Sequence, residues 1–375
     1  MGFRKTWREG KASVESDLRK ENLQGTSHGR NYGIDLLRLV LMFMVCMLHT
    51  LIKGGVMNAS VPGTSGYKVY LFLETLCYCA VDGFAIISGY TASNRPRKFE
   101  KLVDMWFQAF FYSFVLTAIL TIVGINETWT KIDMIKCALP VSNRRFWYFT
   151  AFFGLYFAIP LLNAFLFSVS EDAAKKALIL IVVLFSVMGT ISDPFTSGKG
   201  YSAIWLMALY SIGVLAKRIK LFETRRSITL LVWLALSLVF TWAVCDYTGI
   251  RSLLCFVSPT ILFSGMIMVV LFSRIPAKGT IISKLSPLAF GIYLFQINTV
   301  IWNNILCDAA AGIAKKPVLV GIPLVFGFAL AIFLSGLAVE FVRSKLAKAF
   351  RIHKLSKWIV AKADFVLEKL FVFLK

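Results

Sequence analysis

The feature that most constrains this chain is a series of long apolar runs, each separated from the next by a short polar connection. A helix needs about 20 apolar residues to cross the roughly 30 Å hydrocarbon core of a bilayer. We count ten such runs, the fifth and sixth of them barely long enough: 34–53, 69–92, 105–125, 147–167, 177–192, 201–216, 227–246, 253–272, 285–305 and 317–342. The sequence therefore predicts an all-α polytopic membrane protein with about ten transmembrane helices.

Lysine and arginine are distributed unequally between the connections. If the N-terminus lies in the cytoplasm, the connections and tails on that side carry 30 of these residues and the opposite side carries 10. This bias predicts that both termini are cytoplasmic in a multi-pass protein of the cell membrane. The formal net charge of +21 is then explained by topology and by contact with anionic lipid head groups, so nucleic acid is not an expected partner.

The two ends of the chain differ from its apolar middle. Residues 1–33 are charged and without pattern, which predicts a polar cytoplasmic tail before one membrane domain over 34–345. Residues 346–375 predict a basic amphipathic helix that lies in the membrane interface, with an eleventh span as the alternative. Its apolar stripe consists of Ile359, Ala363, Val366, Leu367, Leu370 and Leu374.

Two polar residues interrupt the first run, which reads IDLLRLVLMFMVCMLH over 34–49. Arg38 and His49 are eleven residues apart, or about three helical turns, so both side chains project from one face with an axial separation of roughly 16 Å. Asp35 lies one turn before Arg38 and is placed to pair with it. Structural explanations exist for each residue: Arg38 can reach the inner head groups and His49 can bond a neighbouring carbonyl. Histidine in a span is, however, also the side chain best suited to moving a proton.

The second run, KVYLFLETLCYCAVDGFAIISGYTASN over 68–94, adds two acids. Glu74 lies at about the same depth as His49, and consecutive helices are usually neighbours, so we expect a contact in which Glu74 orients the imidazole. Asp82 lies deeper and is a candidate catalytic group because an isolated acid at that depth is costly. The small residues Gly83, Ser88 and Gly89 indicate close helix packing, with a narrow ligand passage as the alternative.

The outer side of the chain offers candidate acceptor-binding groups. The connection 126–145 carries cations against the charge bias, either without consequence or as a surface for an anionic or polyhydroxylated acceptor. Trp147 and Tyr148 begin the fourth run, where aromatic residues usually anchor a helix at the interface but can also stack on sugars. Gln296 and Asn298, in the ninth run, either bind neighbouring helices or line a polar cavity.

The signatures of soluble enzymes are absent from the sequence. We find no phosphate-binding glycine loop, no nucleophile elbow and no HExxH metal motif. Cys77 and Cys79 have no second cysteine pair nearby, so no metal site is predicted.

Taken together, four segments resemble the membrane-bound acyltransferase-3 family, in order and across about 31–345. They are GIDLLRLVLMFMVCMLH with its Arg38–His49 spacing, AVDGFAIISGY (80–90), FWYFTAFFGLYFAIPLLN (146–163) and SPLAFGIYLFQ (286–296). The resemblance implies ten spans with both termini inside, a catalytic His49 and an essential Arg38. It also implies transfer of an acetyl group from acetyl-CoA to an exported glycan such as a capsule or cell-wall polymer. Many members have a histidine where this chain has Gln296, so any role of that second histidine is missing here.

The resemblance leads to one expected mechanism. Arg38, with Arg95, Arg97 and Lys98 of the inner RPRK connection, would bind the acetyl-CoA phosphates. His49 would act as a general base on an acceptor hydroxyl, with Glu74 or Asp82 steadying the imidazolium, or it would carry the acetyl group itself. Buried ionisable residues also suit a proton-coupled transporter or lipid-linked glycan flippase, and an inactive scaffold is a third interpretation.

Overall fold

The computed structural model describes residues 30–126, 128–276 and 279–373, and within these ranges its regular elements are all helical. The α-helices are α2 (Tyr32–Leu51), α3 (Val56–Ala59), α4 (Ser65–Tyr78), α5 (Ala80–Tyr90), α6 (Phe99–Phe110), α7 (Leu116–Ile122), α8 (Lys131–Ala138), α9 (Trp147–Leu166), α10 (Glu171–Ile181), α11 (Met188–Ile191), α12 (Ala203–Arg218), α13 (Ser227–Thr248), α14 (Pro259–Ser273), α15 (Thr280–Leu285), α16 (Ala289–Gln296), α17 (Val318–Ala349) and α18 (Ile352–Phe373). Three segments are π-helical: η1 (Phe111–Val115), η2 (Val182–Val187) and η6 (Ile301–Ile305). Four are short 3₁₀ helices: η3 (Gly198–Gly200), η4 (Arg251–Leu253), η5 (Ser286–Leu288) and η7 (Ala311–Lys315). The protein is an all-α, multi-pass membrane protein, as predicted.

Seven helical stretches of the described residues are long and apolar enough to cross a membrane, fewer than the ten predicted. The run 201–216 corresponds to α12, which has 16 residues, and the run 253–272 overlaps the 15-residue α14. The run 285–305 is broken after α16, because Asn298 accepts hydrogen bonds from the backbone N–H groups of Val300 and Ile301 and so starts a new turn. These three helical segments are too short or too interrupted to meet that criterion alone.

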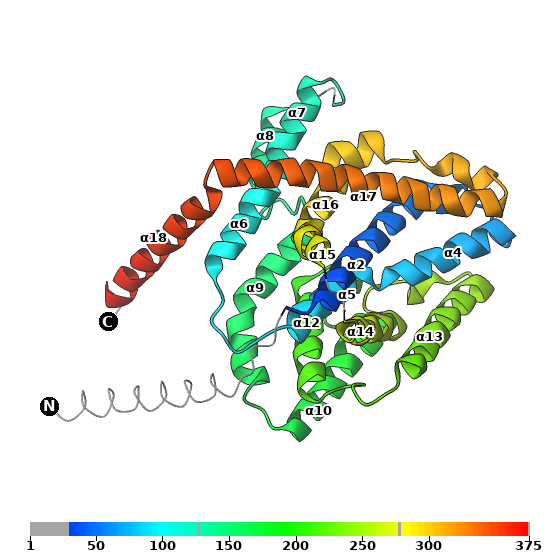
Figure 1. The fold of residues 1–375 in the computed structure, drawn as a ribbon, viewed down its shortest axis with the longest axis horizontal. Helices are drawn as coiled ribbons and strands as arrows, with labels where there is room; N and C mark the ends of the chain where they lie inside the picture. Colours follow the sequence, from blue (N-terminus) through cyan, green and yellow to red (C-terminus); the bar gives the residue numbers. More distant parts are fainter. Residues whose placement is uncertain (1–29, 127, 277–278, 374–375) are drawn as a thin grey trace.

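Helix α2 lies in the middle of the helices (Figure 1). It packs against α4, α5, α14, α16 and α17, and most of its side chains are buried. Asn31 caps its start by accepting from the N–H of Ile34 at 3.1 Å. The predicted tail 1–33 therefore ends earlier than expected, since α2 begins at Tyr32; residues 1–29 lie outside the described part of the chain. This central position brings the polar groups of α2 into the interior.

Helices α5 and α12 cross at a point where neither can carry a side chain. A Cβ on Gly89 would collide with the backbone carbonyl of Tyr210, and one on Gly213 would collide with that of Ile86. Similarly, a Cβ on Gly83 would lie 2.7 Å from Leu41 of α2. The packing interpretation of Gly83 and Gly89 is therefore confirmed.

We expect Gly89→Ala to lower the thermal midpoint of the detergent-purified protein by several degrees or more. The clash is with backbone, which no change of side-chain rotamer relieves, and overpacking of this kind costs about 1–3 kcal/mol. Gly327→Ala is the matched control, because Gly327 is exposed on α17 with no neighbouring atom within 4 Å of an added Cβ. Equal midpoints for the two variants would contradict the proposed crossing.

The C-terminal boundary also differs from the predicted one. Helix α17 continues through residue 345 to Ala349, and the chain turns at Arg351, which has a φ of 53°. Helix α18 then runs away from the end of α17 (Figure 1) and contacts α6, where His353 and Asp104 approach to 2.7 Å. Of the predicted stripe, Leu374 lies outside the described residues, while Val366, Leu367 and Leu370 are exposed. A helix therefore forms here, and its place in the membrane interface stays a prediction.

Candidate active site

A cavity of about 590 Å³ lies beside α2. The face of α2 toward it presents Arg38, Met42, Val45, His49 and Ile52, which follow one another at helical spacing. The prediction that Arg38 and His49 share one face is confirmed, and both residues line the same cavity. The remaining lining residues are Leu48, Tyr78, Val81, Phe84, Arg144, Arg145, Trp147, Tyr148, Tyr201, Phe256, Ser286, Pro287, Ala289, Phe290, Tyr293, Ile297, Thr299 and Trp302.

A buried carboxylate holds Arg38 at one end of this cavity. Asp35 accepts from Arg38 Nη1 at 2.7 Å and also forms an ion pair with Arg30. The hydroxyl of Ser286, from η5, donates to the same carboxylate at 3.2 Å. Two guanidinium groups thus share one carboxylate, so the cluster keeps one excess positive charge, and the Arg38 side chain remains 33% exposed. Such a group can bind an anion at the cavity wall.

Two residues hold the His49 side chain in place: Gln296, the last residue of α16, and Trp302, which lies in η6. The Nδ1 atom of His49 lies 3.0 Å from Oε1 of Gln296, and the His49 ring meets the indole of Trp302 edge to face, with centroids 4.7 Å apart. The imidazole therefore has a defined orientation although its residue is only partly buried.

The surroundings of Gln296 determine which nitrogen of His49 carries the proton. Nε2 of Gln296 lies 3.7 Å from the sulfur of Met42, which can only accept a hydrogen bond, so the amide nitrogen faces Met42 and Oε1 faces His49. Since a carbonyl oxygen cannot donate, Nδ1 of His49 must donate to it. In the neutral ring Nε2 of His49 is then the unprotonated atom, which is the form that a general base requires.

Aromatic side chains form a further part of the cavity wall. Trp147 contacts Tyr201 and Phe256, with ring centroids 4.5 and 5.8 Å apart, and the Tyr148 N–H donates to the Tyr293 hydroxyl at 3.1 Å. Both of the predicted acceptor-binding aromatics, Trp147 and Tyr148, thus line the cavity. Flat apolar faces of this kind suit a thin acyl chain or the face of a sugar ring.

The expected contact between Glu74 and His49 is wrong. Glu74 is buried, but its carboxylate forms an ion pair with Arg251, next to the C-terminal end of α13. Asp82 is also buried and accepts from Trp205 Nε1 of α12 at 3.1 Å. Neither acid lines the cavity, so neither is placed to steady the imidazolium of His49.

Of the two interpretations given for Asn298, the structure supports binding to a neighbouring helix and not its candidate role in acceptor binding, because its hydrogen bonds join helical segments and it does not line the cavity. The amide nitrogen donates to the Tyr112 carbonyl at 2.7 Å and to Thr117 Oγ1 at 2.9 Å. Its oxygen accepts from Val300 and Ile301. The Tyr112 carbonyl belongs to the wide turn η1, so Asn298 joins two irregular helix segments and does not face the cavity.

The inner basic connection lies apart from the cavity of Arg38. Arg95, Arg97 and Lys98 line a separate depression with Val360 and Asp364 of α18, among other residues. Arg97 also donates to the Tyr210 hydroxyl at 3.3 Å. The three basic residues predicted to bind the donor with Arg38 are therefore not assembled around Arg38.

One contact of the site was not predicted. The contact of Gln296 with His49 joins residues 247 positions apart, and no sequence signal specifies it. Arg144 and Arg145 line the cavity as well; the sequence offered their connection as a surface for an anionic or polyhydroxylated acceptor without singling out these two residues.

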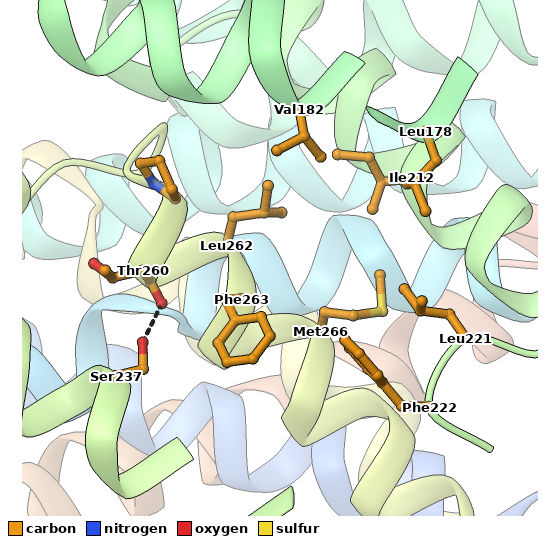
Figure 2. Close-up of a pocket in the computed structure, with 11 residues that line it drawn as sticks. Leu178, Val182, Ile212, Leu221, Phe222, Ser237, Thr260, Leu262, Phe263 and Met266 are labelled. Carbon is orange, nitrogen blue, oxygen red and sulfur yellow. Dashed lines mark hydrogen bonds between the residues drawn. The ribbon is translucent and has the colours of Figure 1, made fainter. Parts of the chain in front are cut away.

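A second cavity, of about 370 Å³, lies between α10, α12, α13 and α14 (Figure 2). Leucine, isoleucine, valine, phenylalanine and methionine side chains surround it, and the hydroxyl of Ser237 is already bonded to the Thr260 carbonyl at 3.0 Å. Since none of its described lining residues is titratable, the chemistry is assigned to the cavity of His49.

Comparison with known protein families matches residues 31–340 to the acyltransferase domain called acyltransferase-3. No curated protein and no solved structure matches the chain significantly. The matched region begins just before α2 and ends within α17, and thus contains all of the residues that line the cavity. The chain belongs to the acyltransferase-3 family and is a membrane acyltransferase.

Proposed function

We propose that this protein transfers the acetyl group of cytoplasmic acetyl-CoA to a hydroxyl of an exported or cell-surface glycan, with His49 as general base. The observation that carries the proposal is the 3.0 Å contact between Gln296 Oε1 and Nδ1 of His49, a residue that lines the same cavity as Arg38. The contact favours the tautomer whose Nε2 accepts a proton, and the family supplies the reaction class.

The two ends of α2 suit a donor and an acceptor on opposite sides of the membrane. Arg38 lies near the start of α2, on the predicted cytoplasmic side, where its excess charge would bind an acetyl-CoA phosphate. The thin arm of the cofactor would extend along the apolar wall toward His49, about 16 Å further along the helix axis. The protein would lie in the cell membrane with both termini cytoplasmic.

In the proposed reaction, Nε2 of His49 takes the proton of the acceptor hydroxyl as the oxygen attacks the thioester carbonyl. The C–S bond breaks when the tetrahedral intermediate collapses, and the imidazolium returns the proton to the coenzyme A thiolate. Gln296 accepts from Nδ1 throughout, so it holds the ring in both protonation states. An acetyl-histidine intermediate would use the same Nε2 atom as a nucleophile.

The direct test incubates the purified protein with labelled acetyl-CoA and a panel of glycans. The proposal expects label to appear in an ester of the glycan together with free coenzyme A. Proton-dependent glycan uptake into vesicles, without any acyl product, would instead identify a transporter or flippase.

We expect Arg38→Gln to raise the KM for acetyl-CoA about tenfold or more while leaving the KM for the acceptor unchanged, because a charge-assisted hydrogen bond contributes about 1.5–3 kcal/mol. Initial rates at varied donor and acceptor concentrations measure the two constants. Arg95→Gln is the comparison, since Arg95 lines the separate depression. A larger rise in the donor KM for Arg95→Gln than for Arg38→Gln would show that the acetyl-CoA phosphates bind at the basic connection of Arg95 and not at Arg38.

A further inference from the structure

The end of the cavity opposite Arg38 carries positive charge that the described part of the protein does not neutralise. Arg144 and Arg145 both line the cavity, and neither forms an ion pair with any described carboxylate. Among the described residues that line the cavity there are three arginines and no aspartate or glutamate. The wall is therefore cationic at both ends.

Two other cations predicted to lie on this side of the membrane have carboxylate partners, whereas the remaining lysines of this side form no ion pair with a described carboxylate. Arg251 has Glu74 as its partner, and Lys68 lies 3.3 Å from Asp246. The acid nearest in sequence to the two arginines on their own connection is Asp133, and it completes the capping box of α8 by accepting from the Thr130 backbone N–H at 3.3 Å, as well as from the Thr130 hydroxyl at 2.7 Å. Among the arginines predicted to lie on this side, Arg251 is therefore paired, while Arg144 and Arg145 of the cavity wall have no described carboxylate partner.

Arg145 is fixed to the segment that holds His49. Its Nη1 donates to Thr299 Oγ1 at 3.2 Å. In the sequence, Thr299 is three residues from both Gln296 and Trp302, the two residues that contact His49. Three residues of chain span at most about 11 Å, so Arg145 is bonded to the same short segment of chain that contacts His49. The Nε atom of Arg145 is buried and has no hydrogen-bond partner in the described structure. A buried donor of this kind is costly until a ligand satisfies it.

We propose that the acceptor is anionic and carries a phosphate or carboxylate group close to the hydroxyl that is acetylated. Arg144 and Arg145 would bind that group while His49 takes the hydroxyl proton. This inference rests on the proposed acetyl transfer and adds the substrate class to it. Planar guanidinium groups suit either anion, and the cationic end of a cavity with apolar walls would also concentrate anionic acceptors.

The test uses two matched pairs of acceptors with labelled acetyl-CoA. One pair is a uronic-acid oligosaccharide and its carboxyl-reduced counterpart, and the other is a polyol-phosphate oligomer and the free polyol. We expect one charged member, which identifies the anion, to have a KM at least tenfold below that of its neutral counterpart. The double variant Arg144→Gln/Arg145→Gln should lose this preference and keep the donor KM.

Two further variants separate charge from folding. The double variant Arg144→Lys/Arg145→Lys retains the charge and should retain most of the preference for the anionic acceptor. The control Lys131→Gln/Lys136→Gln removes two cations from the same connection that do not line the cavity, and should behave as the wild type. Equal KM values for charged and neutral acceptors, or a glutamine double variant that raises the donor KM instead, would overturn the inference. Absence of transfer to every acceptor would overturn the proposed function itself.

Discussion

Replacing His49 by alanine is expected to lower the rate of acetyl transfer by about 10²- to 10⁴-fold, the range that a positioned general base contributes. The remaining residues of the cavity provide no substitute, because the described lining set contains no other histidine and no carboxylate. The loss should appear in kcat, while binding of acetyl-CoA, measured by calorimetry on the purified variant, should persist because Arg38 is unchanged.

The control for this variant is His353→Ala, which removes a histidine at the contact of α18 with α6 and not in the cavity. Both variants should be present in membranes at wild-type levels. A folded His49→Ala protein that acetylates the glycan at the wild-type rate would refute the role of His49 as base and as acetyl carrier alike.

Replacing Gln296 by leucine is expected to reduce kcat by about 10- to 100-fold although Gln296 does not touch the substrate in this account. Leucine leaves the Nδ1–H of His49 without an acceptor, so the ring is free to rotate or to adopt the other tautomer, in which Nε2 is protonated. Substrate KM values should change little, because Gln296 is not among the residues that line the cavity. Steady-state kinetics as a function of pH measure this effect.

Gln296→Glu provides the matched comparison. A carboxylate also accepts from Nδ1, so this variant should recover much of the activity that leucine loses. Because the negative charge favours the protonated imidazole, the acidic limb of the pH–rate profile should move to higher pH. A leucine variant with wild-type kcat, or a glutamate variant whose profile does not shift, would show that the contact does not control the proton on His49.

The sequence was sufficient for features that depend on helical periodicity alone. The 3.6-residue repeat places Arg38, Met42, Val45 and His49 on one face, and the structure confirms this face as a cavity wall. Apolar run length likewise predicted a multi-pass helical protein. Seven described helical stretches meet the length criterion; of the other three predicted runs, two form the shorter helices α12 and α14, and one is broken at Asn298, which hydropathy does not register.

Contacts between helices were predicted less well, because depth in the membrane does not determine rotation about a helix axis. Glu74 has the depth expected for a partner of His49, yet its side chain pairs with Arg251. The residue that does contact His49, Gln296, comes from the ninth apolar run, 247 residues later in the chain. Proximity in sequence favoured the wrong neighbour, and only the packing of α16 against α2 identifies the correct one.

Transfer across sealed, inside-out membrane vesicles tests the central claim most directly. Labelled acetyl-CoA is supplied only to the cytoplasmic face, now outside, and the glycan acceptor is enclosed in the lumen. The account predicts acetylated glycan in the lumen of wild-type vesicles and almost none with His49→Ala. Transfer that occurs only when donor and acceptor share one compartment, or that proceeds equally without His49, would contradict it.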